Sequence, residues 1–284
     1  MTTETILFAG PSAAGKSNYL FRAWLSIAKS REGRLRTNGT PDELDYIWEG
    51  SNRQLSGEFA QKTQLDVSEM IVIPLMVDER KLELTVPDRP GEDWSNLYFD
   101  RRFPGHWDEL ITSASGILFF LPSQIPDDPI DRMQTDQFGG SNATMAQGKD
   151  MSLSGPPMQT LITDVIMMCV ERRRQLNGRP MKLGIVVTAW DMLHDEDQWI
   201  GPLDHLRQEH KLLHDFVSTN ADVLDMSVFG VSLFGGDLND EEFRAEVLAG
   251  EPSRMGYTFH NLQGAVERSD DVLLPIKWAL DALD

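Results

Sequence analysis

The segment Gly10-Pro11-Ser12-Ala13-Ala14-Gly15-Lys16-Ser17 decides the fold of this chain. It matches the pattern G-x-x-x-x-G-K-[ST], in which backbone N–H groups turn inward around an anion and glycine permits the unusual dihedral angles of the turn. An apolar run, residues 6–9, precedes the segment, and a helical pattern follows it over about 15–28. A strand, a glycine loop and a helix in this order predict a phosphate-binding loop, because the helix N-terminus also attracts phosphate.

The polar residues of this loop have predicted roles. Lys16 is expected to bind the β- and γ-phosphates of a nucleoside triphosphate, and the Ser17 hydroxyl to ligate Mg2+. The predicted nucleotide contacts in this part of the chain are Gly10, Ser12, Ala13, Ala14, Gly15, Lys16, Ser17 and Asn18.

Short apolar runs alternate with helical patterns along the rest of the chain. Residues 116–121, 182–188 and 226–233 are largely apolar, as in strands covered on both faces. Helices are expected at about 156–176, around 204–216 and at 271–283, with another beginning near residue 40. This alternation predicts an α/β fold with a mainly parallel sheet, one antiparallel edge strand and helices on both faces.

A hairpin is predicted between residues 70–77 and 82–87, which are apolar or alternating runs separated by four charged residues. Pro74 lies inside the first run. Since proline cannot donate a hydrogen bond to a neighbouring strand, this run is expected to form the edge of the sheet.

The composition excludes some classes of function. The chain has 284 residues, 26 Lys and Arg against 45 Asp and Glu, and a net charge of −19, which argues against nucleic acid as the main partner. No apolar run approaches the roughly 18 residues of a membrane span, and Glu4 stands where a signal peptide carries positive charge. The single cysteine, Cys169, lies in an apolar run that indicates a buried thiol. We therefore expect a cytoplasmic protein without membrane insertion.

Residues 122–155 differ in composition from the rest, with many Asp, Gly, Ser and Asn and few large apolar side chains after Met133. The segment is predicted to be a long, mobile insertion. It follows the carboxyl end of a strand, where open α/β sheets bind their ligands. Two interpretations stay open: a passive surface loop, and a lid or partner-contact element.

A second motif, Asp88-Arg89-Pro90-Gly91, follows the second strand of the predicted hairpin. A carboxylate at this place can hold Mg2+ through a water molecule, and the Gly91 N–H can meet the γ-phosphate and respond to its loss. By itself, an Asp with a Gly three residues later is mostly a turn. Its position after a phosphate loop and a hairpin favours the functional interpretation.

A third motif, Thr188-Ala189-Trp190-Asp191, ends the strand at 182–188. An aspartate at this place can accept hydrogen bonds from guanine N1–H and the 2-amino group together, which adenine does not offer. The alternative is that Asp191 caps the following helix, a task for which Asp is also well suited.

The order of these motifs resembles that of the Ras-like, translation-factor class of P-loop GTPases, and is similar to the bacterial double-GTPase group, predicted members of conflict or defence systems. The resemblance implies a Ras-like fold in one domain, 1–284, with an insertion at switch I over about 31–64 and the flexible insertion at about 122–155. It also implies GTP or GDP and Mg2+ as ligands. Thr63 would be the switch I threonine that closes on Mg2+ and the γ-phosphate, and a Ser232 backbone amide would support the guanine 6-oxo group.

The chain departs from the family pattern at several positions. Glu92 follows Gly91 where glutamine commonly orients water; a carboxylate can act as a base but repels the γ-phosphate, so efficient hydrolysis is not expected. Ala189 replaces a lysine that packs on the base, and stacking by Trp190 is one conceivable substitute. The stretch Ser232-Leu233-Phe234 departs from the usual S-A-K.

Charged and aromatic residues gather around the predicted switch II. Arg89, Arg101 and Arg102 lie in or near it. One of them can act as an arginine finger, or all can be solvated or paired with nearby acids. The aromatic residues of this segment indicate either core packing or a partner-docking surface; they are Trp94, Tyr98, Phe99, Phe103 and Trp107.

These observations predict a GTP-binding molecular switch that hydrolyses GTP slowly and signals through a protein effector or regulator, with a possible oligomer. The catalytic residues are expected to be Lys16, Thr63, Gly91 and Glu92, the Mg2+ ligands Ser17, Thr63 and Asp88, and the base-binding residues Thr188, Asp191 and Ser232. Two other hypotheses stay open: a P-loop ATPase in which Asp191 is only a cap, and a pseudo-GTPase scaffold that binds nucleotide without turnover.

Overall fold

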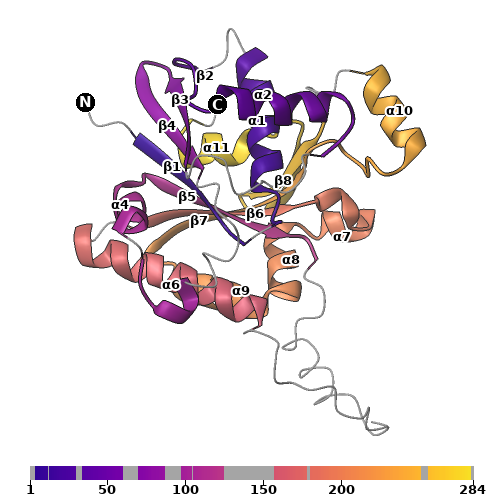
Figure 1. Cartoon of the computed structure of the whole chain (residues 1–284). Coiled ribbons are helices and arrows are strands. Elements are labelled where there is room, and N and C mark those ends of the chain that lie inside the picture. The colour runs from indigo at the N-terminus through magenta and orange to yellow at the C-terminus, as the bar shows by residue number, and fades with distance from the viewer. Residues whose placement is uncertain are drawn as a thin grey trace, which may run out of the picture.

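A nine-stranded mixed sheet forms the centre of the molecule in a computed structural model of the chain (Figure 1). The structure describes residues 4–11, 13–29, 34–59, 70–86, 97–103, 105–124, 157–177, 180–250 and 255–282. The strands are β1 (Glu4–Ala9), β2 (Leu35–Thr37), β3 (Ile71–Val77), β4 (Arg80–Val86), β5 (Gly116–Pro122), β6 (Met181–Thr188), β7 (Leu224–Ser232), β8 (Tyr257–Leu262) and β9 (Ala265–Ser269). Their order across the sheet is β2-β3-β4-β1-β5-β6-β7-β8-β9.

The five central strands, β4-β1-β5-β6-β7, run parallel. The phosphate-loop strand β1 lies between β4 and β5, so that Ile6 is opposite both Leu84 and Gly116. Most residues of β5 and β6 are buried, because helices cover both faces of the sheet. The α/β fold class expected from the sequence is confirmed.

Two hydrophobic cores lie on opposite faces of this sheet (Figure 1). One core packs α1 and α2 with α11, and the other packs α4, α6, α8 and α9. The helical elements are α1 (Lys16–Lys29), α2 (Leu44–Leu55), α4 (Gly105–Ser113), α6 (Met158–Asn177), the 3-10 turn η1 (Trp190–Met192), α7 (Asp195–Trp199), α8 (Pro202–Glu209), α9 (Lys211–Thr219), α10 (Glu241–Ala249) and α11 (Leu274–Ala279).

The strand that contains Pro74 is not the edge of the sheet, so this expectation was wrong. The predicted hairpin is formed by β3 and β4, but the short strand β2 pairs with the outer side of β3. Strand β2 ends at Thr37, opposite Leu75, and the Pro74 carbonyl accepts a hydrogen bond from the Asn38 N–H at 2.9 Å. Pro74 is tolerated because its nitrogen, which has no hydrogen to donate, faces the outer side of β3 beyond the end of β2 and not the neighbouring strand β4.

The other end of the sheet also differs from the expected single antiparallel edge. Strands β8 and β9 form a hairpin that continues the sheet antiparallel to β7. Its turn, Gln263-Gly264, has positive φ at both residues (+50° and +86°), the geometry that two-residue hairpins prefer. The sequence signal for strand β8 is an apolar residue at every second position, Tyr257 and Phe259. Two such residues are too few to predict a strand.

Two helical regions are shorter or more divided than expected. The region 204–216 holds two helices, α8 and α9, which meet at His210. The last helix, α11, covers only part of 271–283, with Pro275 in its first turn, where a missing N–H costs little.

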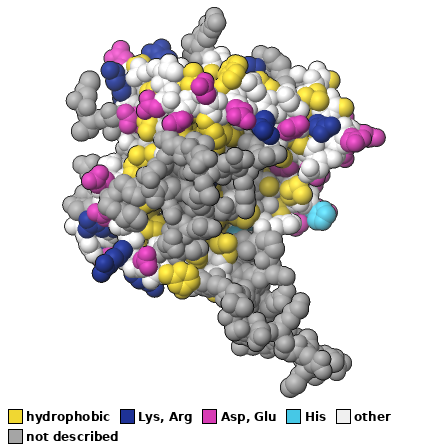
Figure 2. Space-filling model, viewed as in Figure 1, with side chains coloured by type: hydrophobic (Ala, Val, Ile, Leu, Met, Phe, Trp, Pro, Cys, Tyr) yellow, Lys and Arg dark blue, Asp and Glu magenta, His cyan; other side chains and the backbone are white. Residues whose placement is uncertain are grey.

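Acidic and basic side chains are interspersed around the face of the molecule drawn in Figure 2. Cys169 is buried in the core, as predicted, and burial raises the pKa of its thiol to about 12. Within the described ranges, no helix has the length and apolar character needed to cross a membrane.

Candidate nucleotide site

The predicted phosphate loop follows β1 directly and leads into α1. The Lys16 ammonium folds back over the loop and donates to the carbonyl oxygens of Gly10 and Pro11, at 2.7 and 2.8 Å. Lys16 is buried, 9% exposed, while Ser17 and Asn18 in the first turn of α1 are half-buried. The lysine is thus held within the loop by carbonyls that a phosphate oxygen can replace as partners of the ammonium.

The backbone of the loop requires its glycines. Gly10 has φ of +131°, and a Cβ built on it would lie 2.4 Å from the Phe120 oxygen of β5. Gly15 has φ of +83°, with the Thr188 side chain 3.1 Å from such a Cβ. Ala13 also adopts a left-handed conformation, with φ of +60°. These values give the loop its inward turn against the neighbouring strands.

Thr188 connects the phosphate loop to the predicted base motif. Its hydroxyl lies 3.1 Å from the Ala14 oxygen and 3.2 Å from the Leu121 oxygen. The structure therefore brings the first and third sequence motifs together, although Thr188 is engaged within the protein.

Asp191 lies inside the turn η1, and the N-cap of this turn is Ala189 in a left-handed conformation. Asp191 is therefore not a helix cap. The Ser232 hydroxyl donates to its carboxylate and accepts the Gly235 N–H at 2.8 Å. Burial raises the pKa of Asp191 above its ordinary value, and the Ser232 hydrogen bond opposes this rise. Two residues predicted for the base thus meet, although Ser232 acts here through its side chain.

Trp190 does not point toward the site, so the idea that it stacks on the base was wrong. Its side chain is fully buried in the core. A Cβ built on Gly230 of β7 would lie 2.3 Å from the indole, and the His205 ring centroid is 5.0 Å away. The large apolar ring is stabilised by burial between β7 and α8, which determines its direction.

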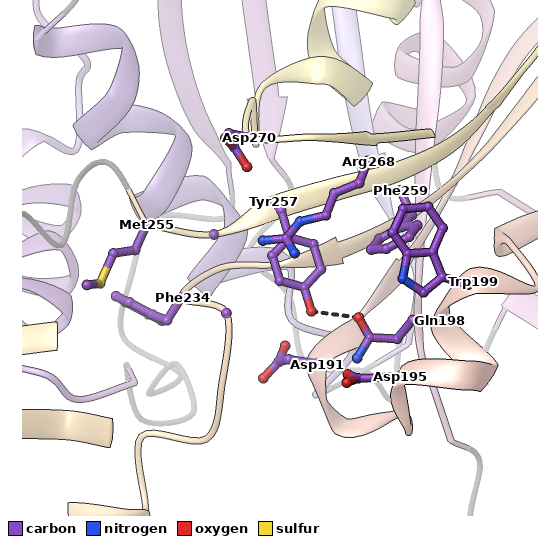
Figure 3. Close-up of a pocket in the computed structure, with 12 residues that line it drawn as sticks. Asp191, Asp195, Gln198, Trp199, Phe234, Met255, Tyr257, Phe259, Arg268 and Asp270 are labelled. Carbon is purple, nitrogen blue, oxygen red and sulfur yellow. Dashed lines mark hydrogen bonds between the residues drawn. The ribbon is translucent and has the colours of Figure 1, made fainter. Parts of the chain in front are cut away.

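Asp191 lines a pocket of about 510 Å³ that the sequence analysis missed (Figure 3). The walls come from segments around α7, from the loop after β7 and from the β8–β9 hairpin. The lining residues include Gln198, Phe234, Met255, Tyr257 and Arg268. No local motif marks these residues, because they gather only when the hairpin pairs with β7.

Arg22 of α1 connects the helix of the phosphate loop to this pocket. Its side chain is 2% exposed and donates to the Leu233 oxygen at 3.2 Å, to the Met255 oxygen, and to the Ser26 hydroxyl at 2.6 Å. Burial lowers the pKa of Arg22 to about 10, so the guanidinium is charged at neutral pH. The two segments that present Phe234 and Met255 are thereby fastened to α1.

Two histidines lie behind the base motif. The Nε2 atom of His205 is 3.0 Å from the Ser123 oxygen, and the Ser123 hydroxyl donates to the Ala189 oxygen at 3.0 Å. His210 packs near His205, with ring centroids 6.1 Å apart, and neither of its ring nitrogens has a hydrogen-bond partner among the described residues. Burial lowers the pKa of both rings, that of His210 to about 4. Both are neutral at pH 7.

Several predicted site residues lie outside the described part of the chain. They are Ser12, Thr63, Asp88, Gly91 and Glu92, together with Arg89, Trp94 and most of the insertion 122–155. Their predicted roles stay predictions.

The described part of the segment near switch II has mixed roles. Arg101 pairs with Asp164 at 2.5 Å and lies 5.6 Å from the Tyr98 ring centroid, so it is engaged as the structural interpretation expected. Trp107 is buried in the core, whereas Phe99 is 63% exposed.

The residues present fit a nucleoside triphosphate with Mg2+. The loop offers an anion cradle whose shape excludes a side chain at Gly10, and the Ser17 hydroxyl stands in the first turn of α1. Among the described residues no cluster of three His, Cys, Asp or Glu side chains suits a metal ion.

A protein-family comparison matches residues 7–279 to the family described as Double-GTPase 1. No curated protein matches the chain.

Three solved structures illustrate what the chain is similar to. The signal recognition particle receptor SRb-GTP/SRX complex from Chaetomium thermophilum is 14% identical, with 88% of this chain and 99% of that chain covered and a TM-score of 0.42. The Arl6 BBS3 small GTPase from Trypanosoma brucei, with bound GppNp, is 11% identical, with 89% and 99% covered and a TM-score of 0.39. The GTP-bound GTPase-like domain of S. cerevisiae Ski7 is 16% identical, with 81% and 42% covered and a TM-score of 0.44.

Proposed function

The chain belongs to the Double-GTPase 1 family, and we propose that it is a cytoplasmic molecular switch that binds GTP with Mg2+ and hydrolyses it slowly to GDP. The observation that carries the proposal is the placement of Asp191. Its carboxylate is held by Ser232 at the wall of a pocket, and Thr188 joins the same motif to the phosphate loop. A carboxylate in this position selects guanine, since N1–H and the 2-amino group are donors on one edge.

In the proposed reaction, water attacks the γ-phosphorus and the bond to the β–γ bridging oxygen breaks, which yields GDP and inorganic phosphate. Lys16 leaves the Gly10 and Pro11 carbonyls and binds the β- and γ-phosphates. Ser17, Thr63 and Asp88 would hold Mg2+, which neutralises charge that develops on the phosphates. Gly91 would contact the γ-phosphate, and Glu92 would orient water poorly because its carboxylate repels this group.

Exchange of Asp191→Asn tests the guanine assignment. The variant is expected to bind GTP about 10- to 100-fold more weakly, because a hydrogen bond to a charged group is lost. It should bind xanthosine triphosphate more tightly, since the Asn amide can donate to the 2-oxo group. Asp225→Asn, an exposed position on β7, is the control. Equal GTP affinity of the wild type and Asp191→Asn would contradict the proposal.

Competition and turnover measurements separate the two alternatives. An ATPase would bind ATP in preference to GTP, and Asp191→Asn would leave this preference unchanged. A non-catalytic scaffold would bind GTP tightly without phosphate release in a single-turnover assay, both in the wild type and in Glu92→Gln. Slow release by the wild type, accelerated in Glu92→Gln, is the result that we expect.

The proposed output is a surface that changes with the nucleotide and meets a protein effector, with the segment around 122–155 as a contact. A role in a bacterial conflict or defence system is part of the proposal through the family resemblance. Capture of partners on the immobilised protein, loaded with a non-hydrolysable GTP analogue or with GDP, tests this output. Partners that bind both forms equally would contradict a switch.

A further inference from the structure

Arg268 of β9 lies at the wall of the pocket with its guanidinium over the Tyr257 ring, 4.1 Å from the ring centroid (Figure 3). Tyr257 is itself held, because its hydroxyl donates to Gln198 Oε1 at 2.8 Å and Gln198 Nε2 donates to the Leu193 oxygen at 2.9 Å. A cation over a fixed aromatic ring is restricted in its orientation before any ligand arrives. The hairpin thus presents a positioned donor group to the pocket.

Several other side-chain donors near Asp191 are already engaged. The Thr188 hydroxyl has one proton and two protein acceptors, Ala14 and Leu121. The Ser232 hydroxyl donates to Asp191, and the Gln198 amide donates to Leu193. Within the described residues, Arg268 has its ring contact and no hydrogen-bonded acceptor. Its guanidinium is therefore available to a ligand.

Two of the charged side chains that line the pocket, Asp191 and Arg268, match two edges of one base, and Asp195 and Asp270 also line the pocket. Asp191 lies at the hydroxyl end of Tyr257, and the Arg268 guanidinium lies over the ring (Figure 3). Guanine has donors at N1 and the 2-amino group, which suit Asp191, and acceptors at O6 and N7, for which a bidentate arginine is the matching donor. Adenine has an amino group in place of O6 and would meet the guanidinium with a donor.

We infer that Arg268 is a second specificity-determining residue, which donates to guanine O6 and N7 while Asp191 accepts from the opposite edge. This inference rests on the proposed function, because it requires guanine in the Asp191 pocket. It assigns to the β8–β9 hairpin a contact with the O6 and N7 edge of the base.

Binding of GTP and 7-deaza-GTP, in which a C–H group replaces N7, tests the inference. The wild type is expected to bind 7-deaza-GTP roughly 5- to 50-fold more weakly than GTP, within the range for a bidentate arginine–guanine pair. Arg268→Met keeps the apolar stem and should bind the two nucleotides equally. Arg268→Lys keeps the charge but loses the fork, so it should not restore the full difference.

Arg207→Met is the matched control, since Arg207 is an exposed arginine of α8 that pairs with Asp204. It should retain the wild-type ratio of the two affinities, and thermal melting should show that all variants are folded. Two results would overturn the inference: equal binding of GTP and 7-deaza-GTP by the wild type, or an unchanged ratio in Arg268→Met. If Asp191→Asn lowers the affinity for GTP in the same series, the proposed function stands and only the role of Arg268 is contradicted. If Asp191→Asn leaves the affinity for GTP unchanged, both are contradicted.

Discussion

At the phosphate end of the site, eight consecutive residues, 10–17, provide the backbone turn, the lysine and the serine. At the base end, Asp191 depends on Ser232 for a hydrogen bond, and the pocket walls come from α7, the loop after β7 and the β8–β9 hairpin. The two ends touch at Thr188 and are fastened together by Arg22. In the proposed function, recognition of phosphate needs a local motif, whereas recognition of the base needs an assembled fold.

This difference has a chemical reason. A phosphate offers acceptor oxygens on every side, so a ring of backbone N–H groups with one cation is sufficient. A base must be distinguished by the pattern of donors and acceptors on its edges, so its partners must stand at separate, well-defined places. The tests below ask how far the two ends act independently.

Lys16→Ala should have the largest effect, because it removes the cation at the phosphate end. We expect a loss of about 100-fold or more in affinity for GTP and ATP alike, since charge-assisted contacts to phosphate disappear. Lys81→Ala, an exposed position of β4, is the control. Isothermal titration with both nucleotides measures the effect. A loss for one nucleotide only would show that Lys16 influences the base end.

Arg22→Met should remove the hydrogen bonds that connect the phosphate end of the site to the base end. It leaves the Leu233 and Met255 carbonyls without their donor in a buried place, which is expected to lower the free energy of unfolding by about 2–3 kcal/mol. Chemical denaturation measures this change. An unchanged unfolding free energy would mean that the ends are held together by Thr188 and packing alone.

His210→Leu should make the fold less sensitive to acid. The folded-state pKa of His210 is lowered to about 4, so as pH falls below about 6.5 the unfolded chain takes up a proton first and the folded state loses stability until about pH 4. The cost at pH 5 is about 2 kcal/mol. Unfolding free energies at pH 7 and 5 should therefore differ less in the variant than in the wild type. An equal difference in both proteins would contradict a buried, neutral His210.

Asp191→Asn should have the smallest effect on folding stability. It should raise the stability of the nucleotide-free protein slightly, although it lowers the affinity for GTP. Burial raises the folded-state pKa of Asp191, so the charged carboxylate lowers the stability of the nucleotide-free protein at neutral pH, and this cost disappears as pH falls through the raised pKa. The variant should melt slightly higher at pH 7, with a smaller gain at low pH. A lower melting temperature at pH 7 would indicate that the Ser232 hydrogen bond outweighs burial.

The central part of the fold was predictable because each element carries its own signal. The strands β1, β5 and β6 each contain an apolar run, at residues 6–9, 117–121 and 185–187, and the helix α1 follows a glycine loop. The hairpin β3–β4 was also correct, but Pro74 alone does not reveal a three-residue neighbour such as β2. A short strand has too few residues for a periodic pattern, and it forms only because its partner is already in place.

The base end was predicted only in part. Asp191 and Ser232 are brought together, while Trp190 proved to be a core residue. The sequence does not distinguish a tryptophan that stacks on a base from one that packs in the core. The direction of the Trp190 side chain is set by the space that Gly230 leaves for the indole ring.

By itself, the sequence determined that the chain has a phosphate loop on a mainly parallel α/β sheet, because loop shape and helix start depend on neighbours along the chain. Only the tertiary structure decided which side chains line the pocket of Asp191. Tyr257 and Arg268 line the same pocket as Asp191 because β8 pairs with β7 and β9 pairs with β8. Contacts between residues so distant along the chain depend on strand pairing and on burial of the two cores, which no local pattern of residues encodes.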